Sequence, residues 1–261
     1  MNGCWSEQTQ ADTRFCVFRP ARPHVHGYTI FFLHDEDESL PLRDPAIERL
    51  LDEKRLSVVA PLCGPIWSLD VQTERGLPRE FLTERVLPAA RQIAIAAATE
   101  DAPAADKSGT QRARLALLGH GMGGQALLRI AYDYPDKYPI VAAVEPTIDF
   151  HLHVRDGHPL LCEMFADEEA ARQHTAILHI HPLNWPRHHF FCADPMSYPW
   201  FDGVDRLKMK LAASGVQFEC ELESSAAQTA EETNPSYFQM LADKAIGHCE
   251  HGLERERLRI V

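Results

Sequence analysis

One stretch decides the fold of this chain: Leu115-Ala116-Leu117-Leu118-Gly119-His120-Gly121-Met122-Gly123-Gly124. An apolar run with the character of a buried strand ends at a glycine-rich turn, and a helix-like segment over 125–134 follows at once. In the pattern G-x-S-x-G, a turn of this kind holds a nucleophilic serine between a strand and a helix. Here the pattern reads G-H-G-M-G, so Gly121 stands where the serine would be.

The same glycines also fit G-x-G-x-x-G, the phosphate-binding turn of dinucleotide-binding folds, at Gly119, Gly121 and Gly124. That turn normally follows the first strand of its fold and is followed by an acidic residue about 20 positions further on. Here at least three strand-like segments precede the turn, and Glu145, near the expected offset, ends a following strand in either fold. The position in the chain therefore favours the nucleophile turn, and no cofactor is predicted.

Strand-like and helix-like segments alternate on both sides of the turn. Strands are predicted at 13–18, 27–33, 56–60, 115–119, 140–144, 189–192 and 216–220, and helices at 44–54, 79–99, 125–134, 204–214 and 235–257. This alternation predicts a single α/β domain over 1–261, with a mostly parallel sheet covered by helices on both faces. Residues 1–12 are expected to form a flexible N-terminus, 100–112 a surface insertion and 146–186 a helical excursion.

The composition restricts the compartment and the partners. The chain has 261 residues, a formal net charge of −12 and 45% hydrophobic residues. A strongly negative balance disfavours binding to nucleic acid or to an anionic membrane surface. The seven cysteines are odd in number and include no C-x-x-C, which is typical of buried thiols in a reducing compartment. With no signal-peptide pattern and no long apolar run, we expect a soluble cytoplasmic protein, and a homo-oligomer remains open.

Further motifs surround the turn: Phe31-Phe32-Leu33-His34, Tyr132-x-x-Pro135-Asp136-x-Tyr138, Asp149-Phe150-His151, and Phe191-Cys192-Ala193-Asp194-Pro195 followed by Trp200-Phe201-Asp202-Gly203. With Gly119-x-x-Met122-Gly123-Gly124-Gln125, they resemble the α/β-hydrolase superfamily and, within it, the esterase D / S-formylglutathione-hydrolase-like group. The resemblance covers about residues 25–255 and implies Asp194 as the catalytic acid, with Asp202 as the second choice. It also places a set of residues around the oxyanion site and the pocket: His34, Asp35, Trp67, His120 and Met122.

Two positions of the implied catalytic triad lack their functional residue. Gly121 has no side chain that can attack a substrate. The loop that should present the base histidine spans 229–238, and the resemblance aligns Thr233 with the base. No histidine occurs between His189 and His248. The sequence therefore predicts that both the nucleophile and the base are lost.

A third departure concerns the oxyanion site. Members of the family carry His-Gly after the early strand, whereas here His34 is followed by four acids at 35–38. A carboxylate about 4 Å from a developing oxyanion would repel it by roughly 4 kcal/mol at an effective dielectric near 20. A solvated loop pointing away from the site is the alternative. Glycine at 121 has its own physical reason, because a residue with a Cβ is strained in a nucleophile turn.

Histidines cluster in the excursion and beyond it, as His151-x-His153, His179-x-His181 and His188-His189. The two rings of His-x-His share a face in a strand, but the region 168–180 has a helical pattern, in which they do not. No H-E-x-x-H pattern occurs, so packed or hydrogen-bonded histidines are favoured and no metal is predicted.

The sequence thus predicts an esterase-like pseudoenzyme that binds a small molecule or a protein partner. The alternative is an active carboxylic-ester or thioester hydrolase that uses non-standard groups, such as Asp194 or a cysteine from the loops. The identity of the ligand, substrate or partner does not follow from the residues.

Overall fold

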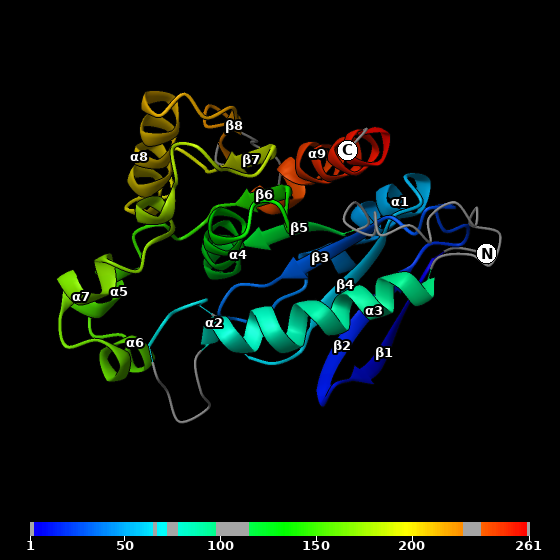
Figure 1. Ribbon diagram of the computed structural model, residues 1–261, viewed down its shortest axis with the longest axis horizontal. Coiled ribbons are helices and arrows are strands. Elements are labelled where there is room, and N and C mark those ends of the chain that lie inside the picture. The colour runs from blue at the N-terminus through cyan, green and yellow to red at the C-terminus, as the bar shows by residue number, and fades with distance from the viewer. Residues whose placement is uncertain (1–2, 65–66, 72–77, 98–114, 227–235, 260–261) are drawn as a thin grey trace.

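The computed structural model describes residues 3–64, 67–71, 78–97, 115–226 and 236–259. Its centre is an eight-stranded sheet in the order β1-β2-β4-β3-β5-β6-β7-β8 (Figure 1). The strands are β1 (Cys4–Gln10), β2 (Thr13–Arg19), β3 (Thr29–Leu33), β4 (Ser57–Pro61), β5 (Leu115–His120), β6 (Ile140–Val144), β7 (His188–Cys192) and β8 (Glu219–Glu221). From β4 to β8 all neighbours are parallel, and only β1 and β2 run antiparallel to their neighbours. The predicted mostly parallel sheet is confirmed.

Helices cover both faces of this sheet, as the sequence predicted. The helices are α1 (Pro45–Glu53), α2 (Pro78–Glu80), α3 (Leu87–Ala97), α4 (Gly121–Asp133), α5 (His151–Arg155), α6 (Pro159–Met164), α7 (Glu168–Arg172), α8 (Trp200–Ala213) and α9 (Tyr237–Leu258). One apolar cluster joins α3, α4 and α8 to one face, and a second joins α1 and α9 to the other. Side chains of β3, β5 and β6 alternate between the two clusters, so these central strands are buried on both sides.

The N-terminus differs from the sequence-based expectation. The prediction of a flexible segment over 1–12 is wrong for residues 4–10, which form β1 and pair with β2 from Cys4↔Arg19 to Gln10↔Thr13. Polar residues dominate β1, so its own pattern does not mark a buried strand. The backbone of β2 and the contact of Trp5 with Phe18, at 5.3 Å between ring centroids, order it instead. The predicted insertion at 100–112 lies outside the described residues.

Local signals placed the start of α1 correctly, whereas two other predicted helices differ from the structure. Asp44 caps α1 by accepting from the backbone N–H of Ala46 at 2.8 Å, and Pro45 takes the first helical position. The helix predicted over 79–99 is instead α2, a π-helical turn η2 (Phe81–Val86) and α3 in succession. The helix after the glycine turn begins at Gly121 rather than Gln125, so the glycines form its first turn.

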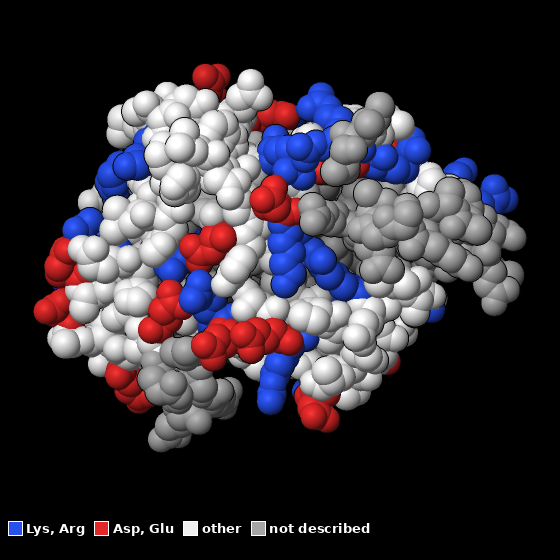
Figure 2. Space-filling model, in the orientation of Figure 1, with Lys and Arg blue, Asp and Glu red and all other residues white. Residues whose placement is uncertain are grey.

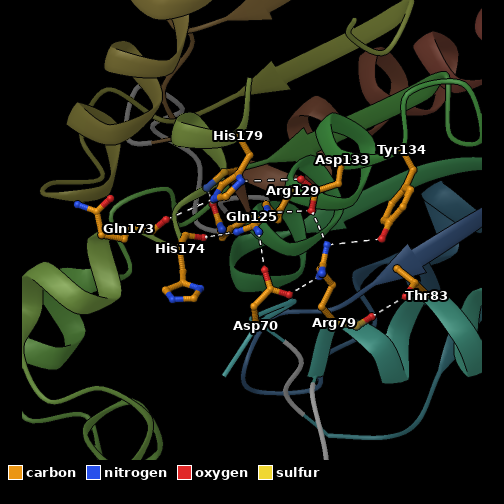
Figure 3. A network of polar contacts seen from close by, with 11 residues as sticks. Asp70, Arg79, Thr83, Gln125, Arg129, Asp133, Tyr134, Gln173, His174 and His179 are labelled. Atoms are coloured by element: carbon orange, nitrogen blue, oxygen red, sulfur yellow. Dashed lines mark hydrogen bonds and ion pairs between the residues drawn. The ribbon is translucent and has the colours of Figure 1, made fainter. Parts of the chain in front are cut away.

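A buried arginine on α4 connects the sheet to the excursion (Figure 3). The side chain of Arg129 is 3% exposed and donates to Asp70 at 2.8 Å, to Asp133 at 3.0 Å and to the carbonyl of His174 at 3.1 Å. Arg79 pairs with the same two carboxylates. Three segments distant in sequence, at residues 70–79, 129–133 and 174, are therefore held together by Arg129, Arg79 and their partners.

The face of the molecule drawn in Figure 2 shows Lys and Arg in small groups with Asp and Glu beside them. Among the described residues of this face, no wide area of a single charge sign is visible.

A histidine in the core makes the stability of the fold depend on pH. His189 in β7 is 2% exposed, and its Nε2 lies 3.0 Å from the Tyr132 hydroxyl. Burial, with a smaller contribution from His248, lowers the pKa of His189 to about 3. The unfolded chain, with a pKa near 6.5, therefore binds one more proton than the native state between pH 6.5 and about 3.

We expect this histidine to stabilise the fold fully above pH 6.5 and to lose its contribution as the pH falls, by about 1.4 kcal/mol per pH unit. His189→Gln should reduce the slope of the free energy of unfolding against pH by that amount. The slope is measured by urea denaturation between pH 7 and 5. His181→Gln, at an exposed position, serves as the control. An unchanged slope in His189→Gln would show that other groups dominate acid unfolding.

Candidate functional site

The glycine turn has the backbone geometry of a nucleophile elbow. β5 ends at His120, and α4 begins at Gly121 with φ of +53°. A φ in this left-handed region strains any residue with a Cβ, and glycine adopts it freely. Gly123 is also required, but because of close packing: a Cβ there would overlap with the carbonyl groups of Leu33 and His34 at the end of β3. The elbow is thereby packed directly against the loop that follows β3.

The carboxylate of Asp35 occupies the centre of this elbow. Its Oδ1 accepts a hydrogen bond from the backbone N–H of Met122 at 2.8 Å. A Cβ built on Gly121 would overlap with the same carboxylate group. In α/β-hydrolases the N–H of the residue after the nucleophile is one of the two oxyanion donors. Here a side chain of the protein itself holds that N–H and fills the space in which a side chain of residue 121 would lie.

The loop that carries Asp35 is anchored at further points. The Nδ1 of the fully buried His34 lies 2.6 Å from the carbonyl oxygen of Asp35. Glu36 pairs with the Nε2 of His158 at 3.0 Å, which joins the loop to the start of α6. Glu38 closes a turn by donating its N–H to the Asp35 carbonyl at 3.1 Å. The acidic loop therefore lies over the elbow, and the predicted alternative of a loop pointing away from the site is wrong for Asp35.

Asp194 lies where the sequence expected the acid, two residues beyond β7 and 8% exposed. Its carboxylate accepts the N–H of Met196 at 2.8 Å and that of Ala226 at 3.0 Å. Burial alone would raise the pKa of Asp194, but these bonds and one from the Ser225 side chain outweigh it and lower the pKa. Asp202, the second choice, is exposed on the first turn of α8. Thr233 lies outside the described residues, so its role and that of Asp194 stay predictions.

The other predicted pocket residues separate into two environments. His120 faces α9, with its ring 5.3 Å from that of Phe238 and its Nε2 3.7 Å from Glu145. Met122 and Trp67 are fully buried on the opposite side, in an apolar cluster with Phe150 beneath α5, α6 and α7. The structure thus brings Asp35 and Met122 together at the elbow and places His120 elsewhere.

Neither a metal centre nor a membrane span is found within the described ranges. No three or more His, Cys, Asp or Glu side chains among them are grouped so as to hold a metal ion. The paired histidines take part in separate contacts, such as His151 with Glu168 at 3.7 Å and His188 with Glu256 at 3.1 Å. None of the described helices is both long enough and apolar enough to cross a bilayer.

The sheet order, the elbow between β5 and α4 and the helices on both faces define the α/β-hydrolase fold. No family model matches the sequence, and comparison with curated proteins finds no match. Solved structures of an esterase and of other hydrolases do match over 99–100% of their length, which confirms at the level of the fold the resemblance read from the sequence.

A ferulic acid esterase superposes with a TM-score of 0.68 at 12% identity, over 97% of this chain and 100% of that one. A fluorophosphonate-binding serine hydrolase of Staphylococcus aureus gives 0.67 at 14% identity, over 96% and 99%. An S-formylglutathione hydrolase from Agrobacterium tumefaciens gives 0.61 at 16% identity, over 98% and 99%. Identities this low establish a common fold and leave the activity of this chain to its own residues.

Sequence reasoning missed the way in which the acidic loop is used. It treated Asp35 as a source of repulsion near an oxyanion and did not foresee the hydrogen bond to Met122 or the pairing of Glu36 with His158. These partners lie 87 and 122 residues apart in the chain. The sequence gives one hint of these contacts: a glycine at the expected serine position occurs together with an unusual acid after His34.

Proposed function

We propose that the protein is a pseudoesterase, meaning an α/β-hydrolase-fold protein without ester hydrolase activity that acts by binding a small molecule or a protein partner. One observation carries the proposal: the Asp35 carboxylate holds the Met122 N–H and fills the side-chain space of residue 121. A substrate carbonyl would need that same N–H, at about 2.7–3.1 Å, to develop negative charge on its oxygen. While Asp35 stays in place, the substrate is excluded both by volume and by charge.

The proposal predicts that a fluorophosphonate probe will label no serine of this protein. These probes need an activated serine hydroxyl, and the elbow has glycine at that position. The fluorophosphonate-binding hydrolase of Staphylococcus aureus is the positive control, treated in parallel and read by intact mass. Stoichiometric labelling mapped to any serine of this chain would overturn the proposal.

The position of Asp35 also favours one alternative, an active carboxylic-ester or thioester hydrolase with a non-standard nucleophile. Carboxylates act as nucleophiles in several enzyme classes, and this one lies where the serine side chain would lie. Its attack on the acyl carbon would expel the alcohol or thiol and leave a mixed anhydride, which water would then open. Cys63 suits the role less, because burial, with Glu38 nearby, raises the pKa of its thiol to about 12.

An assay with an activated aryl ester separates the two functions. A pseudoesterase gives the uncatalysed background rate, with or without the side chain of Asp35. The alternative gives turnover that Asp35→Asn abolishes, since the amide keeps the shape but not the nucleophilic oxygen. Equal turnover by the parent and Asp35→Asn would show that Asp35 neither blocks the site nor acts as the nucleophile.

A further inference from the structure

A groove follows one face of α9 beside the edge strand β8, away from the elbow. Two cavities of about 530 and 420 Å³ adjoin there and share three lining residues, His188, Glu219 and Arg255. The volume of each lies in the range of small-molecule sites. The lining residues of α9 recur at helical spacing, so they share one face of the helix: Lys244, Gly247, His248, His251 and Arg255.

Two glycines of α9 line this groove, and packing explains only one of them. A Cβ on Gly252 would come within 2.8 Å of the Ile140 side chain and 3.4 Å of His188, so that glycine is required by close packing. A Cβ on Gly247 would meet no described atom within 4 Å. Glycine inside a helix is less stable than alanine, and neither crowding nor a positive φ compels it here. The absence of a side chain at Gly247 keeps the floor of the groove open.

The charges of the groove are matched at one end and unmatched at the other. Lys244 pairs with Glu221, and the Nδ1 of His248 lies 3.5 Å from Glu219. Within the described ranges, the side chain of Arg255 makes neither an ion pair nor a hydrogen bond. Asp243, the remaining acid of the lining, lies about 18 Å from Arg255 along the helix, at 1.5 Å per residue, too far to neutralise it.

His248 adds unused hydrogen-bonding capacity beside this open floor. Its side chain is 6% exposed, and its Nε2 makes no hydrogen bond of 3.5 Å or less within the described part of the chain, where the backbone of His188 is a neighbouring polar group. Buried polar atoms of folded proteins are normally paired. A cavity of sufficient size, an open floor, an unmatched cation and an unpaired buried imidazole nitrogen thus occur in one place.

We propose that this groove binds a small anionic molecule bearing a carboxylate or a phosphate group. The anionic group pairs with Arg255, with His251 on the next turn of the same face, and the body of the molecule lies over Gly247. A guanidinium group suits either anion, because its planar donors bind carboxylate and phosphate through two hydrogen bonds. The site is separate from the elbow, so the inference goes beyond the proposed function and holds whether or not the elbow is inert.

Calorimetric titration with citrate and with inorganic phosphate, at constant ionic strength, tests the site. Arg255→Ala should remove the cation of the site and weaken the binding of either anion by about tenfold or more. Gly247→Leu should fill the floor of the groove and weaken the binding of citrate by a similar factor, whereas inorganic phosphate has no body that the new side chain would displace. Gly247→Ala, which adds one methyl group in open space, and Arg85→Ala, which removes an exposed arginine of η2, are the matched controls and should bind as the parent does. The tighter of the two anions identifies the preferred group.

Two outcomes would overturn the proposal. One is that neither anion binds the parent protein with a dissociation constant below about 1 mM. The other is equal binding by the parent, Arg255→Ala and Arg85→Ala, which would indicate general attraction to surface cations. Circular dichroism checks that Gly247→Leu folds, and Arg255→Ala alone decides the question if it does not.

Discussion

Gly121→Ser is expected to lower the free energy of unfolding by about 2–6 kcal/mol and to create no esterase activity. Two costs combine. The residue keeps φ at +53°, where a Cβ is strained by about 1–3 kcal/mol. The new side chain also overlaps with the Asp35 carboxylate, so the packed loop must shift, at a further cost of about 1–3 kcal/mol. Activity stays absent because a serine hydroxyl without a base is a weak nucleophile.

A second glycine separates these two costs. Gly157 has φ of +83°, and no described atom lies within 4 Å of a Cβ built there, so Gly157→Ser carries strain without overlap. Gly121→Ser should therefore be the less stable of the two variants in urea denaturation. Adding Asp35→Gly to Gly121→Ser should recover about 1–3 kcal/mol, because the overlapping carboxylate is gone. Equal stability of the two serine variants would show that Asp35 does not occupy the elbow.

Arg129→Met is expected to destabilise the protein by about 3 kcal/mol. The guanidinium group is 3% exposed and makes charge-assisted hydrogen bonds with Asp70 and Asp133 (Figure 3). Methionine keeps much of the volume but leaves both carboxylates with fewer partners and the buried carbonyl of His174 without its donor. The expected result is a lower midpoint of urea denaturation with an unchanged m-value.

Two further variants show whether geometry or charge is responsible. Arg129→Lys keeps the charge but lacks the planar fork that reaches three acceptors, so it should recover less than half of the loss. Arg172→Met removes an arginine that pairs with Glu169 in the open, and it should change stability by no measurable amount. A small effect of Arg129→Met would mean that Arg79, which contacts the same two acids, suffices to hold them.

The fold class was predictable from local patterns because those patterns report burial. Apolar runs without alternation, such as 115–118 and 140–144, indicate strands buried on both faces, which requires helices on both sides of the sheet. The start of the helix at Pro45 was marked by its capping residue Asp44 and by the proline at its first position. The strand at residues 4–10 was missed, since its polar side chains carry no burial signal and its order comes from pairing with the next strand.

At the candidate site, the sequence determined that residue 121 has no side chain, and only the folded chain placed the Asp35 carboxylate in that space. Gly121 lacks a nucleophile in any conformation, so its chemical consequence can be read from one letter of the sequence. The Asp35 carboxylate reaches the Met122 N–H only because β3 and β5 are neighbours in the sheet and their carboxyl ends meet at one edge. The groove beside α9 also depends on tertiary packing, because β8 lies next to the helix face that carries Gly247. In the sequence alone, nothing marks this glycine as lining a groove. The sequence determines which chemical groups are present. Contacts between distant segments depend on tertiary packing, and the local pattern of apolar residues does not predict them.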